Sequence, residues 1–201
     1  MIEVQARKRL GEFSLAAEMN DSGFICLAGR NGSGKTSLLK AIAGLLQLDE
    51  GIIKINGLEV TRLPVEKRSV IMVRPSSFFP HLDVDSHITW GARLKRMKLG
   101  EGTVSKVKTE LGIDFDGSVR DLSLGMRERV ALATALLASP KVILVDEAFS
   151  NLHGRDEFMT SYGKLSREAG IDVVFSSQEE EDGQLSDHLY TISNGITAKR
   201  R

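Results

Sequence analysis

This 201-residue sequence has a single cysteine, no net charge and no long apolar run. The one cysteine, Cys26, excludes an intrachain disulfide framework and suits a reducing compartment such as the cytosol. Because Cys26 lies in the apolar stretch Phe24–Ala28, we expect a small core residue and not a reactive thiol. The 27 Lys+Arg residues balance the 27 Asp+Glu residues, so no global field attracts nucleic acid and we expect no nucleic-acid partner.

No stretch approaches the roughly 18 apolar residues that a membrane-spanning helix needs. The N-terminal segment Met1–Arg9 alternates apolar and charged residues and lacks the apolar middle of a signal peptide. A membrane process would therefore need another chain to supply its membrane part. Hydrophobic residues make up 41% and charged residues 27%, which is typical of a globular protein that buries a core. The length fits one domain, or one domain carrying an insertion.

Hydrophobic patterns alternate between the periods of strands and helices along the chain. Short apolar runs predict buried parallel strands at Phe24–Ala28, Val70–Val73, Val142–Asp146 and Val173–Ser177. Helical patterns lie at Lys35–Leu46, Trp90–Leu99, Thr103–Leu111 and Val130–Ala138. The segment Gly51–Val60 alternates and contains the turn signal Asn56-Gly57. Asn194-Gly195 after Leu189–Ile192 predicts a closing hairpin.

A glycine-rich loop lies between the first apolar strand and the first helical segment. Its sequence, Gly29-Arg-Asn-Gly-Ser-Gly-Lys-Thr36, matches the phosphate-binding pattern G-x-x-x-x-G-K-[ST]. Glycines let backbone N–H groups turn toward a phosphate, and the helix dipole favours the same anion. We expect Lys35 to reach the β- and γ-phosphates of ATP and Thr36 to ligate Mg²⁺. The predicted nucleotide contacts are Gly29, Arg30, Asn31, Gly32, Ser33, Gly34, Lys35, Thr36 and Ser37.

Two acids end the apolar strand Val142–Val145. A carboxylate at the C-terminal end of a strand beside a P-loop holds Mg²⁺ through water, which assigns Asp146 to the metal. Glu147, one residue further, is placed to polarise the attacking water as general base. We therefore predict that Lys35 and Glu147 act in catalysis and that Thr36 and Asp146 hold the metal.

The alternation of strands, loops and helices around a helical middle predicts an α/β fold. We expect a P-loop NTPase core, interrupted by an inserted helical subdomain and preceded by an antiparallel β portion. Residues 1–74 and 139–201 are assigned to a RecA-like core with its β subdomain, and residues 75–138 to the helical subdomain, all within one domain. The charged run Glu179–Asp182 and the tail Lys199–Arg201 are interpreted as solvated surface. Three histidines, interpreted as surface or locally hydrogen-bonded residues without metal-ligand spacing, are His81, His87 and His188.

The segment between the two nucleotide motifs narrows the choice among P-loop proteins. No N-K-x-D segment for guanine recognition occurs, which argues against a GTPase. Leu122-Ser-Leu-Gly-Met126 with the following Arg127–Leu136 resembles the L-S-G-G-Q signature and helix of the ATP-binding cassette (ABC) proteins. The order of P-loop, signature, Asp146-Glu147 and a Phe149–Leu152 D-loop extends the resemblance over essentially the whole chain. It implies that Ser123 and Gly125 close over the γ-phosphate held by a second subunit.

Within that family the sequence is similar to importer subunits for oxyanions such as molybdate or tungstate, through Lys8–Leu15, Arg74–Leu82 and the stop at residue 201. The resemblance implies a dimer with itself or with a paralogous subunit. It also implies an integral membrane permease as partner and, indirectly, a substrate-binding protein. The implied location is the inner face of the cell membrane, where a cytoplasmic subunit is held by its permease.

Several family positions hold unusual residues. Leu10 stands where relatives stack an aromatic ring on adenine, and Phe13 is expected to face the core. Arg74 replaces the Q-loop glutamine, and Gln178 aligns with the switch histidine, although counting back from Asp187 favours Ser177. The residues implied to bind ATP are thus retained, whereas those implied to sense the γ-phosphate are replaced. We therefore expect ATP binding more firmly than fast hydrolysis. The other replaced positions are Leu124 and Met126 in the signature, Ala148, and His153 in the D-loop.

These departures leave three hypotheses. The first is the ATPase subunit of an importer, with a permease helix received around Phe78–Leu82 and Thr89–Leu94. The second is a regulator that binds ATP to set dimerisation but barely hydrolyses it. The third is the non-catalytic half of a heterodimer with an intact ABC subunit.

Overall fold

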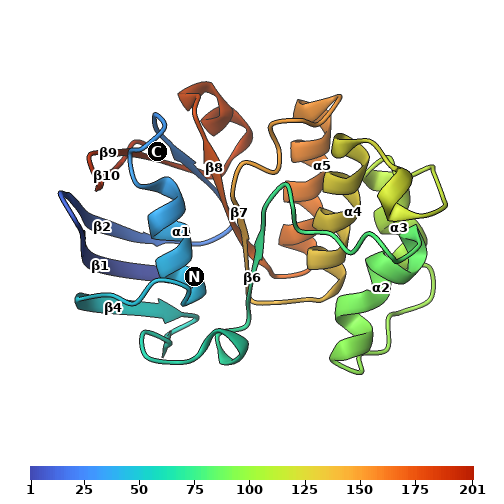
Figure 1. Ribbon diagram of the computed structural model, residues 1–201, viewed down its shortest axis with the longest axis horizontal. Coiled ribbons are helices and arrows are strands. Elements are labelled where there is room, and N and C mark those ends of the chain that lie inside the picture. The colour runs from blue at the N-terminus through green and yellow to red at the C-terminus, as the bar shows by residue number, and fades with distance from the viewer.

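All 201 residues are described by a computed structural model, whose strands form one ten-stranded sheet. The strand order is β5-β4-β1-β2-β10-β9-β3-β8-β7-β6. Antiparallel pairs make up one end of the sheet and parallel pairs the other (Figure 1). The strands are β1 Ile2–Leu10, β2 Phe13–Asp21, β3 Phe24–Ala28, β4 Glu50–Ile55, β5 Leu58–Glu59, β6 Val70–Val73, β7 Val142–Val145, β8 Asp172–Ser177, β9 His188–Ser193 and β10 Ile196–Lys199.

The antiparallel end follows from strict alternation in β1 and β2. Ile2, Val4 and Ala6 are buried, whereas Gln5 and Arg7 between them face solvent. This period of two fits a sheet with one wet face. The hairpin β9–β10 turns at Asn194-Gly195, both at positive φ, as the Asn-Gly signal predicted.

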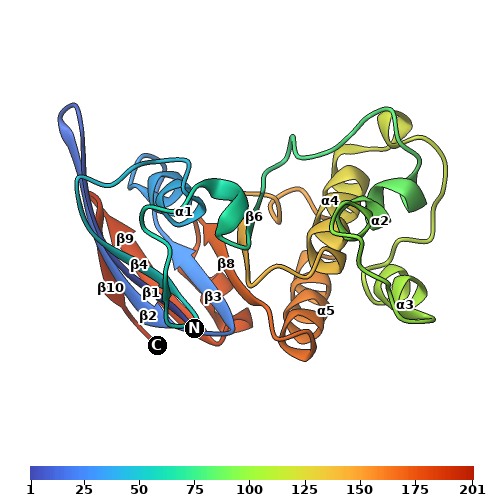
Figure 2. The ribbon, with the colours of Figure 1, turned by 90° about the horizontal axis from the view of Figure 1, so that it is seen from below.

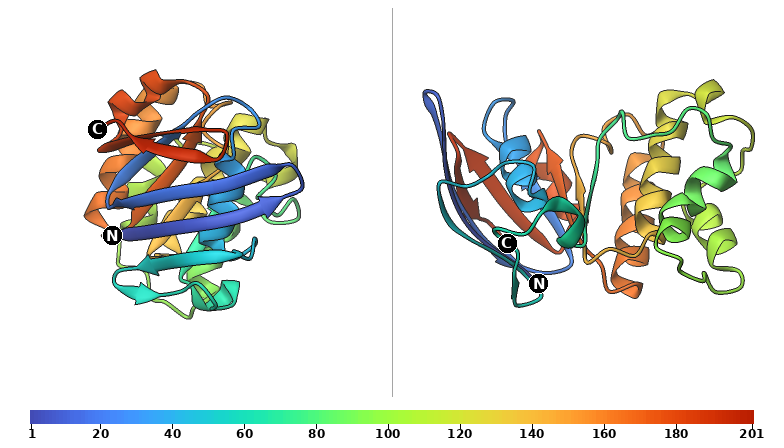
Figure 3. Two further views of the ribbon diagram at one scale, coloured as in Figure 1. Left: turned by 90° about the vertical axis from the view of Figure 1, so that its left-hand side faces the viewer. Right: turned by 60° about the horizontal axis from the view of Figure 1, so that its bottom comes forward.

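The parallel strands β3, β7 and β8 are apolar on both faces because helices cover both. Helix α1, Lys35–Ala43, lies inside the curl of the sheet and contacts β1, β2, β6 and β8 (Figures 2 and 3). One core cluster fills this curl. A second cluster lies between β3, β7 and β8 and the remaining helices. Cys26 is fully buried in the second cluster, where burial raises the pKa of its thiol to about 12, as expected for a core residue.

Four further helices pack on the other side of the parallel strands (Figure 1). They are α2 Val84–Leu94, α3 Thr103–Glu110, α4 Leu124–Leu137 and α5 Arg155–Glu168. Helices α2, α3 and α4 fall between β6 and β7, within the segment 75–138 that we assigned to a helical subdomain. That division of the chain remains a prediction. No helix is both long and apolar enough to cross a membrane.

Three helix predictions were wrong in their bounds, and the one at Val130–Ala138 corresponds to α4, which already begins at Leu124. The helix predicted at Trp90–Leu99 begins earlier, because the Asp83 carboxylate accepts from the backbone N–H of Ser86 and caps α2. It also ends earlier, and Arg96 just beyond adopts a left-handed φ of 53°. The helix predicted at Lys35–Leu46 stops at Ala43, where Gly44 takes a φ of 84° and forms a left-handed C-cap.

Helix α5 was not predicted at all. Most of its residues are polar, which hides a helical pattern of buried side chains. Phe158, Met159, Tyr162 and Leu165 recur at helical spacing and face the core. A window restricted to these four positions would have revealed the helix.

Candidate functional site

The glycine-rich loop joins the end of β3 to the start of α1, as the phosphate-binding motif requires. Two of its glycines have no room for a side chain. A Cβ on Gly29 would lie 2.4 Å from the carbonyl oxygen of Ile192, and one on Gly34 would lie 2.8 Å from Cζ of Phe13. Gly34 also adopts a φ of 112°, which L residues rarely reach. The loop conformation is therefore tied to these residue types.

The Lys35 side chain lies back along this loop. Its Nζ donates to the carbonyl oxygens of Gly29 at 2.5 Å and Arg30 at 3.0 Å, and the residue is only 5% exposed. Burial lowers the pKa of Lys35, while the charges of Glu147 and Asp146 act in the opposite direction. A cation is thus held at the mouth of the loop beside two acids.

The acid pair after β7 lies directly beside the start of α1. Oγ1 of Thr36 and Oγ of Ser176 each donate to Oδ1 of Asp146 at 3.1 Å. The same Ser176 hydroxyl accepts from the backbone N–H of Glu147 at 3.0 Å. Glu147 has a φ of 61° and an exposed side chain that lines the pocket of the loop. The structure thus brings together the predicted metal residues Thr36 and Asp146 and the predicted base Glu147.

A hollow of about 390 Å³ opens over the loop and the start of α1. Its apolar wall comes from Leu10 and Phe13, at the two ends of the β1–β2 turn. Phe13 was expected to face the core, but it is only half-buried and borders this hollow, so that expectation was incomplete. Its ring lies against Gly34, and this closeness of the hairpin to the loop could not be read from the sequence. The other lining residues are Asn31, Gly32, Gly34, Lys35, Thr36, Ser37 and Glu147.

The signature segment lies apart from this hollow. Ser123 caps α4, because its Oγ accepts from the backbone N–H of Met126 at 3.3 Å. Gly125 is packed closely, since a Cβ there would lie 2.9 Å from the carbonyl oxygen of Asn151. Ser123 and Leu124 are exposed, and neither lines the hollow of this chain. Any nucleotide that they contact must therefore be bound outside the hollow of this chain.

A buried carboxylate connects the signature helix to the D-loop. Glu128 on α4 is 1% exposed, and its Oε1 accepts from Nδ2 of Asn151 at 2.9 Å. Its Oε2 is buried without a hydrogen-bond partner, and burial raises the pKa of this side chain. The D-loop is therefore fixed to α4 on its own chain.

The altered sensing positions are exposed. Arg74, after β6, has an exposed side chain, and its backbone N–H donates to Ser77 at 3.0 Å. Gln178, after β8, is exposed as well, and neither residue lines the hollow. The alternative switch residue Ser177 is buried, and its hydroxyl donates to the carboxylate of Asp182. The strand ends bring both positions beside the site, because the backbone N–H of Gly29 donates to the carbonyl oxygen of Ser177 and that of Asp146 to the carbonyl oxygen of Val73. The side chains of Gln178 and Arg74 nevertheless form no hydrogen bond with Lys35 or Glu147.

The interpretation of Glu179–Asp182 as solvated surface was wrong for Asp182. This residue is 7% exposed and forms a bidentate ion pair with Arg155, at the start of α5. Hydrogen bonds from Arg155 and Ser177 hold the pKa of Asp182 below its usual value against the opposing effect of burial. The paired cation comes from the helix that sequence reasoning missed. Among the histidines, His87 is buried and bonds locally to Phe79 and Thr134, within the earlier interpretation.

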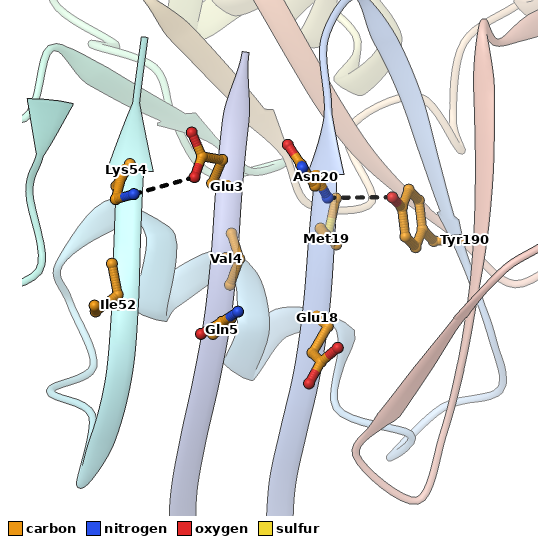
Figure 4. A pocket seen from close by; sticks show the side chains of 9 residues that line it. All are labelled: Glu3, Val4, Gln5, Glu18, Met19, Asn20, Ile52, Lys54 and Tyr190. Atoms are coloured by element: carbon orange, nitrogen blue, oxygen red, sulfur yellow. Dashed lines mark hydrogen bonds and ion pairs between the residues drawn. The ribbon is translucent and has the colours of Figure 1, made fainter. Parts of the chain in front are cut away.

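A second hollow, of about 330 Å³, lies on the antiparallel strands (Figure 4). Glu3 and Glu18 border it, together with Lys54, which pairs with Glu3 at 3.3 Å. It has no glycine loop and no helix N-terminus, so it offers no cradle for a phosphate. This second hollow therefore lacks the features that suit the hollow above α1 to a nucleotide.

A family model described as ABC transporter matches residues 14–150, which include the glycine loop, the signature segment and the acid pair. The chain belongs to the ABC transporter family. It is 34% identical over 201 residues to the sulfate/thiosulfate import ATP-binding protein of Synechocystis sp., covering 94% of this chain and 56% of that protein. It is 30% identical over 198 residues to the spermidine/putrescine import ATP-binding protein of Haemophilus influenzae, covering 94% and 53%. The chain thus spans about half the length of these two relatives.

Solved ABC cassettes share the fold. The protein cbiO1 of Clostridium perfringens, part of the ABC transporter complex cbiONQ, superposes with a TM-score of 0.81 at 24% identity. The match covers 98% of this chain and 86% of that one. An ATP-binding protein from Pyrococcus furiosus gives a TM-score of 0.81 at 21% identity, covering 95% and 96%. The α/β fold expected from the sequence is confirmed as the fold of ABC cassettes.

The residues of the hollow fit a nucleotide with Mg²⁺. Oγ of Ser33 is buried in the glycine loop without a hydrogen-bond partner, as expected of a hydroxyl that would donate to a phosphate oxygen of a bound nucleotide. The hydroxyl of Thr36 and the carboxylate of Asp146 are hard oxygen donors, which Mg²⁺ prefers. They would hold the metal between the start of α1 and the end of β7.

Proposed function

We propose that this chain is the ATP-binding subunit of an ABC importer for a small solute and that it hydrolyses ATP. The observation that carries the proposal is the hydrogen-bonded unit of Thr36, Asp146 and Ser176 beside the glycine loop. It places Asp146 against Thr36, which lines one hollow together with the glycine loop and Glu147. Family membership supports the proposal, since two relatives are named import ATP-binding proteins.

We propose a role for each group that agrees with this geometry. On binding, the loop N–H groups and Lys35 Nζ, released from the Gly29 and Arg30 carbonyls, hold the β- and γ-phosphates. Thr36 and Asp146 would hold Mg²⁺, which would neutralise charge that develops on the phosphates. The exposed carboxylate of Glu147 orients a water molecule and accepts its proton as the water attacks the γ-phosphorus in line. The bond from that phosphorus to the bridging oxygen breaks, and ADP leaves with the electron pair. Leu10 and Phe13 offer adenine an apolar wall.

The second subunit supplies what the hollow lacks. Ser123 and Leu124 are exposed and lie outside the hollow of their own chain, at the N-terminus of α4. A helix N-terminus favours an anion, so the signature of one subunit can close over a γ-phosphate bound by the other. We propose a dimer with itself or with a paralogous ABC subunit, with Ser123 and Gly125 at the shared nucleotide.

An integral membrane permease is the proposed membrane partner, and a substrate-binding protein acts indirectly. The receiving surface is Phe78–Leu82 with Thr89–Leu94, where Phe79 packs on Trp90 with ring centroids 4.5 Å apart. The sulfate/thiosulfate relative supports an oxyanion as solute. The name of the spermidine/putrescine relative shows that subunits of this kind also serve cations. The oxyanion is therefore the finer part of the proposal, and the other subunits select it.

One observation favours an alternative function, a regulator or the non-catalytic half of a heterodimer. The resemblance implies that the residues at positions 74 and 178 contact the γ-phosphate. Arg74 and Gln178 are exposed, however, and neither lines the hollow. A chain of this kind would bind ATP and dimerise without turning over.

Co-purification from native membranes, followed by an ATPase assay, tests both functions. The importer function predicts that the chain is recovered with a permease and that the complex hydrolyses ATP. Recovery with a permease and a second ABC subunit, without hydrolysis at this chain's site, would support the heterodimer. Recovery without any membrane protein would contradict both transport functions.

A further inference from the structure

An uncommonly basic surface lies where α2 ends. Residues Arg93–Lys98 are six consecutive exposed residues, and four of them are cations. No Asp or Glu occurs between Asp85 and Glu101. The chain as a whole carries no net charge, so this local concentration is not part of a general basic character. We call Trp90–Lys98 the basic segment.

Three of its four cations have no partner. Lys95 donates to the carbonyl oxygen of Ala138 at 2.7 Å and so caps the end of α4. Arg93, Arg96 and Lys98 form no ion pair and donate no side-chain hydrogen bond. The helix dipole accounts for a cation in the last turn of α2, but Arg96 and Lys98 lie beyond it.

The lysines of the neighbouring helix behave differently. On α3, Lys106 pairs with Glu168 at 2.7 Å, and Lys108 pairs with Asp85 at 2.8 Å. Cations on this side of the molecule thus usually have carboxylates beside them, which satisfy their charge within the chain. The basic segment keeps its charge available for a partner.

Apolar side chains are interleaved with these cations. Leu94 is 64% exposed, Met97 37% and Trp90 36%. Trp90, Arg93 and Leu94 share one face of α2 because they are three and four residues apart. Tryptophan prefers the boundary between water and lipid, and Arg and Lys lay their apolar stems along such a boundary while their charges reach the headgroups. Exposed apolar groups beside unpaired cations are typical of a surface that lies on an anionic bilayer.

We propose that the basic segment contacts the anionic headgroups of a membrane directly. It lies at the end of the molecule opposite the antiparallel strands, so it can touch a bilayer without covering the nucleotide hollow (Figures 1 and 2). Trp90–Leu94 also belongs to the surface proposed for the permease, so the two contacts overlap there, and Lys95–Lys98 extends beyond the permease surface. The lipid contact goes beyond the proposed function, because it needs neither ATP nor a permease.

Vesicle binding of the full chain tests this contact. The protein is mixed with vesicles of phosphatidylcholine alone, or of phosphatidylcholine with phosphatidylglycerol, and sedimented. We expect binding to the anionic vesicles only. Salt should weaken this binding, because the Debye length is only about 10 Å at 0.1 M ionic strength. Trp90 is the single tryptophan, so its emission reports on the basic segment alone. A blue shift with anionic vesicles is the expected signal.

The triple variant R93Q/R96Q/K98Q removes the unpaired cations and leaves Lys95 in place. Each cation near an anionic surface strengthens binding about fivefold, so the variant should bind on the order of 100-fold more weakly. The matched control, R7Q/R62Q/K67Q, removes the same charge from exposed positions away from α2 and should bind like the parent. Leu94→Ser should reduce binding at unchanged charge.

Three outcomes would overturn the contact. These are equal losses in the two triple variants, equal binding to both kinds of vesicle, and an unshifted Trp90 emission. Binding to soluble polyglutamate without binding to vesicles would assign the surface to an acidic protein segment instead. The ATPase assay of the membrane complex is separate, so failure of lipid binding leaves the proposed function standing, and loss of hydrolysis leaves the lipid contact standing.

Discussion

The loop Gly29–Gly34 and the segment Arg74–Ser77 both follow parallel strands at the same edge of the sheet, β3 and β6, but only the first lines the nucleotide hollow. The two residues that follow the loop bond other parts of the site. Lys35 bonds the loop carbonyls, and Thr36 bonds Asp146. Arg74 instead carries its side chain into solvent. The same contrast holds at β7 and β8, where Asp146 is buried and Gln178 is exposed.

The difference shows which positions of this fold tolerate change. Gly29 and Gly34 face backbone or ring atoms at distances that exclude a Cβ, so substitution there disturbs the core. The exposed positions 74 and 178 can accept other residues at little cost in stability. Packing therefore preserves the binding half of the site, Gly29–Ser37 with Asp146, while the sensing half, Arg74 and Gln178, is free to diverge. Four experiments examine this contrast, from the largest expected effect to the smallest.

Lys35→Ala should remove measurable MgATP binding. It deletes the one side-chain cation that the loop directs at the β- and γ-phosphates. Calorimetric titration measures the loss. Lys40→Ala, near the other end of α1, is the matched control and should bind like the parent. Because Lys35 also bonds its own loop, thermal unfolding of both variants must be compared, and unchanged affinity in folded Lys35→Ala would refute the assignment.

Glu147→Gln should keep MgATP affinity and lower turnover. Loss of a general base costs about 10²–10⁴-fold in rate, so a decrease of at least about 100-fold is expected. Steady-state phosphate release gives the rate, and titration gives the affinity. A variant that turns over as fast as the parent would show that Glu147 is not the base. No turnover in the parent itself would favour the regulator or the non-catalytic half.

Phe13→Ala should weaken MgATP binding by about fivefold to 100-fold, since stacking on a base contributes about 1–3 kcal/mol. Phe13 borders the hollow and touches Gly34, whereas Leu10 offers no ring. Leu10→Ala should therefore have the smaller effect, and Phe13→Tyr should restore affinity. A larger loss of MgATP affinity in Leu10→Ala would show that Leu10, and not Phe13, forms the main contact with adenine.

Much of the binding half could be predicted from the sequence, because its information is local. The glycine pattern specifies a strand, a tight loop and a helix within 20 residues, and the structure has them. The acids after Val145 follow an apolar strand whose end is easily read. Asp146 then meets Thr36 because parallel strands end at a common edge, which topology alone provides.

The parts that were missed depend on contacts between distant segments. Phe13 reaches the hollow only because the β1–β2 hairpin folds over the loop. Asp182 is buried only because Arg155, 27 residues earlier, begins a helix with a mostly polar sequence. A run of four acidic residues is correctly expected to be solvated unless a cation from elsewhere meets it. No local sequence pattern predicts such a distant cation.

The smallest expected effect concerns Arg74 and Gln178 together. We predict that Arg74 restores the positive charge that Gln178 lacks once a second subunit and a permease close the site. In the free chain both side chains are exposed and outside the hollow, so any contribution requires closure. If Arg74 reaches a phosphoryl oxygen, Arg74→Gln alone should slow ATP turnover and Gln178→His alone should change little.

The double variant R74Q/Q178H should then recover activity, which gives the cycle a coupling term of about 0.5–3 kcal/mol, as for residues that share a partner. Steady-state rates of the four proteins with the permease present measure this term. The Ser177→His variant, made in the Arg74→Gln background, is the matched comparison for the other alignment of the switch position. Ser177 is buried and bonds Asp182, so a histidine there would disturb the pair with Arg155 and should not rescue. Strictly additive effects on the rate would mean that the two positions act independently and that Arg74 does not compensate for Gln178.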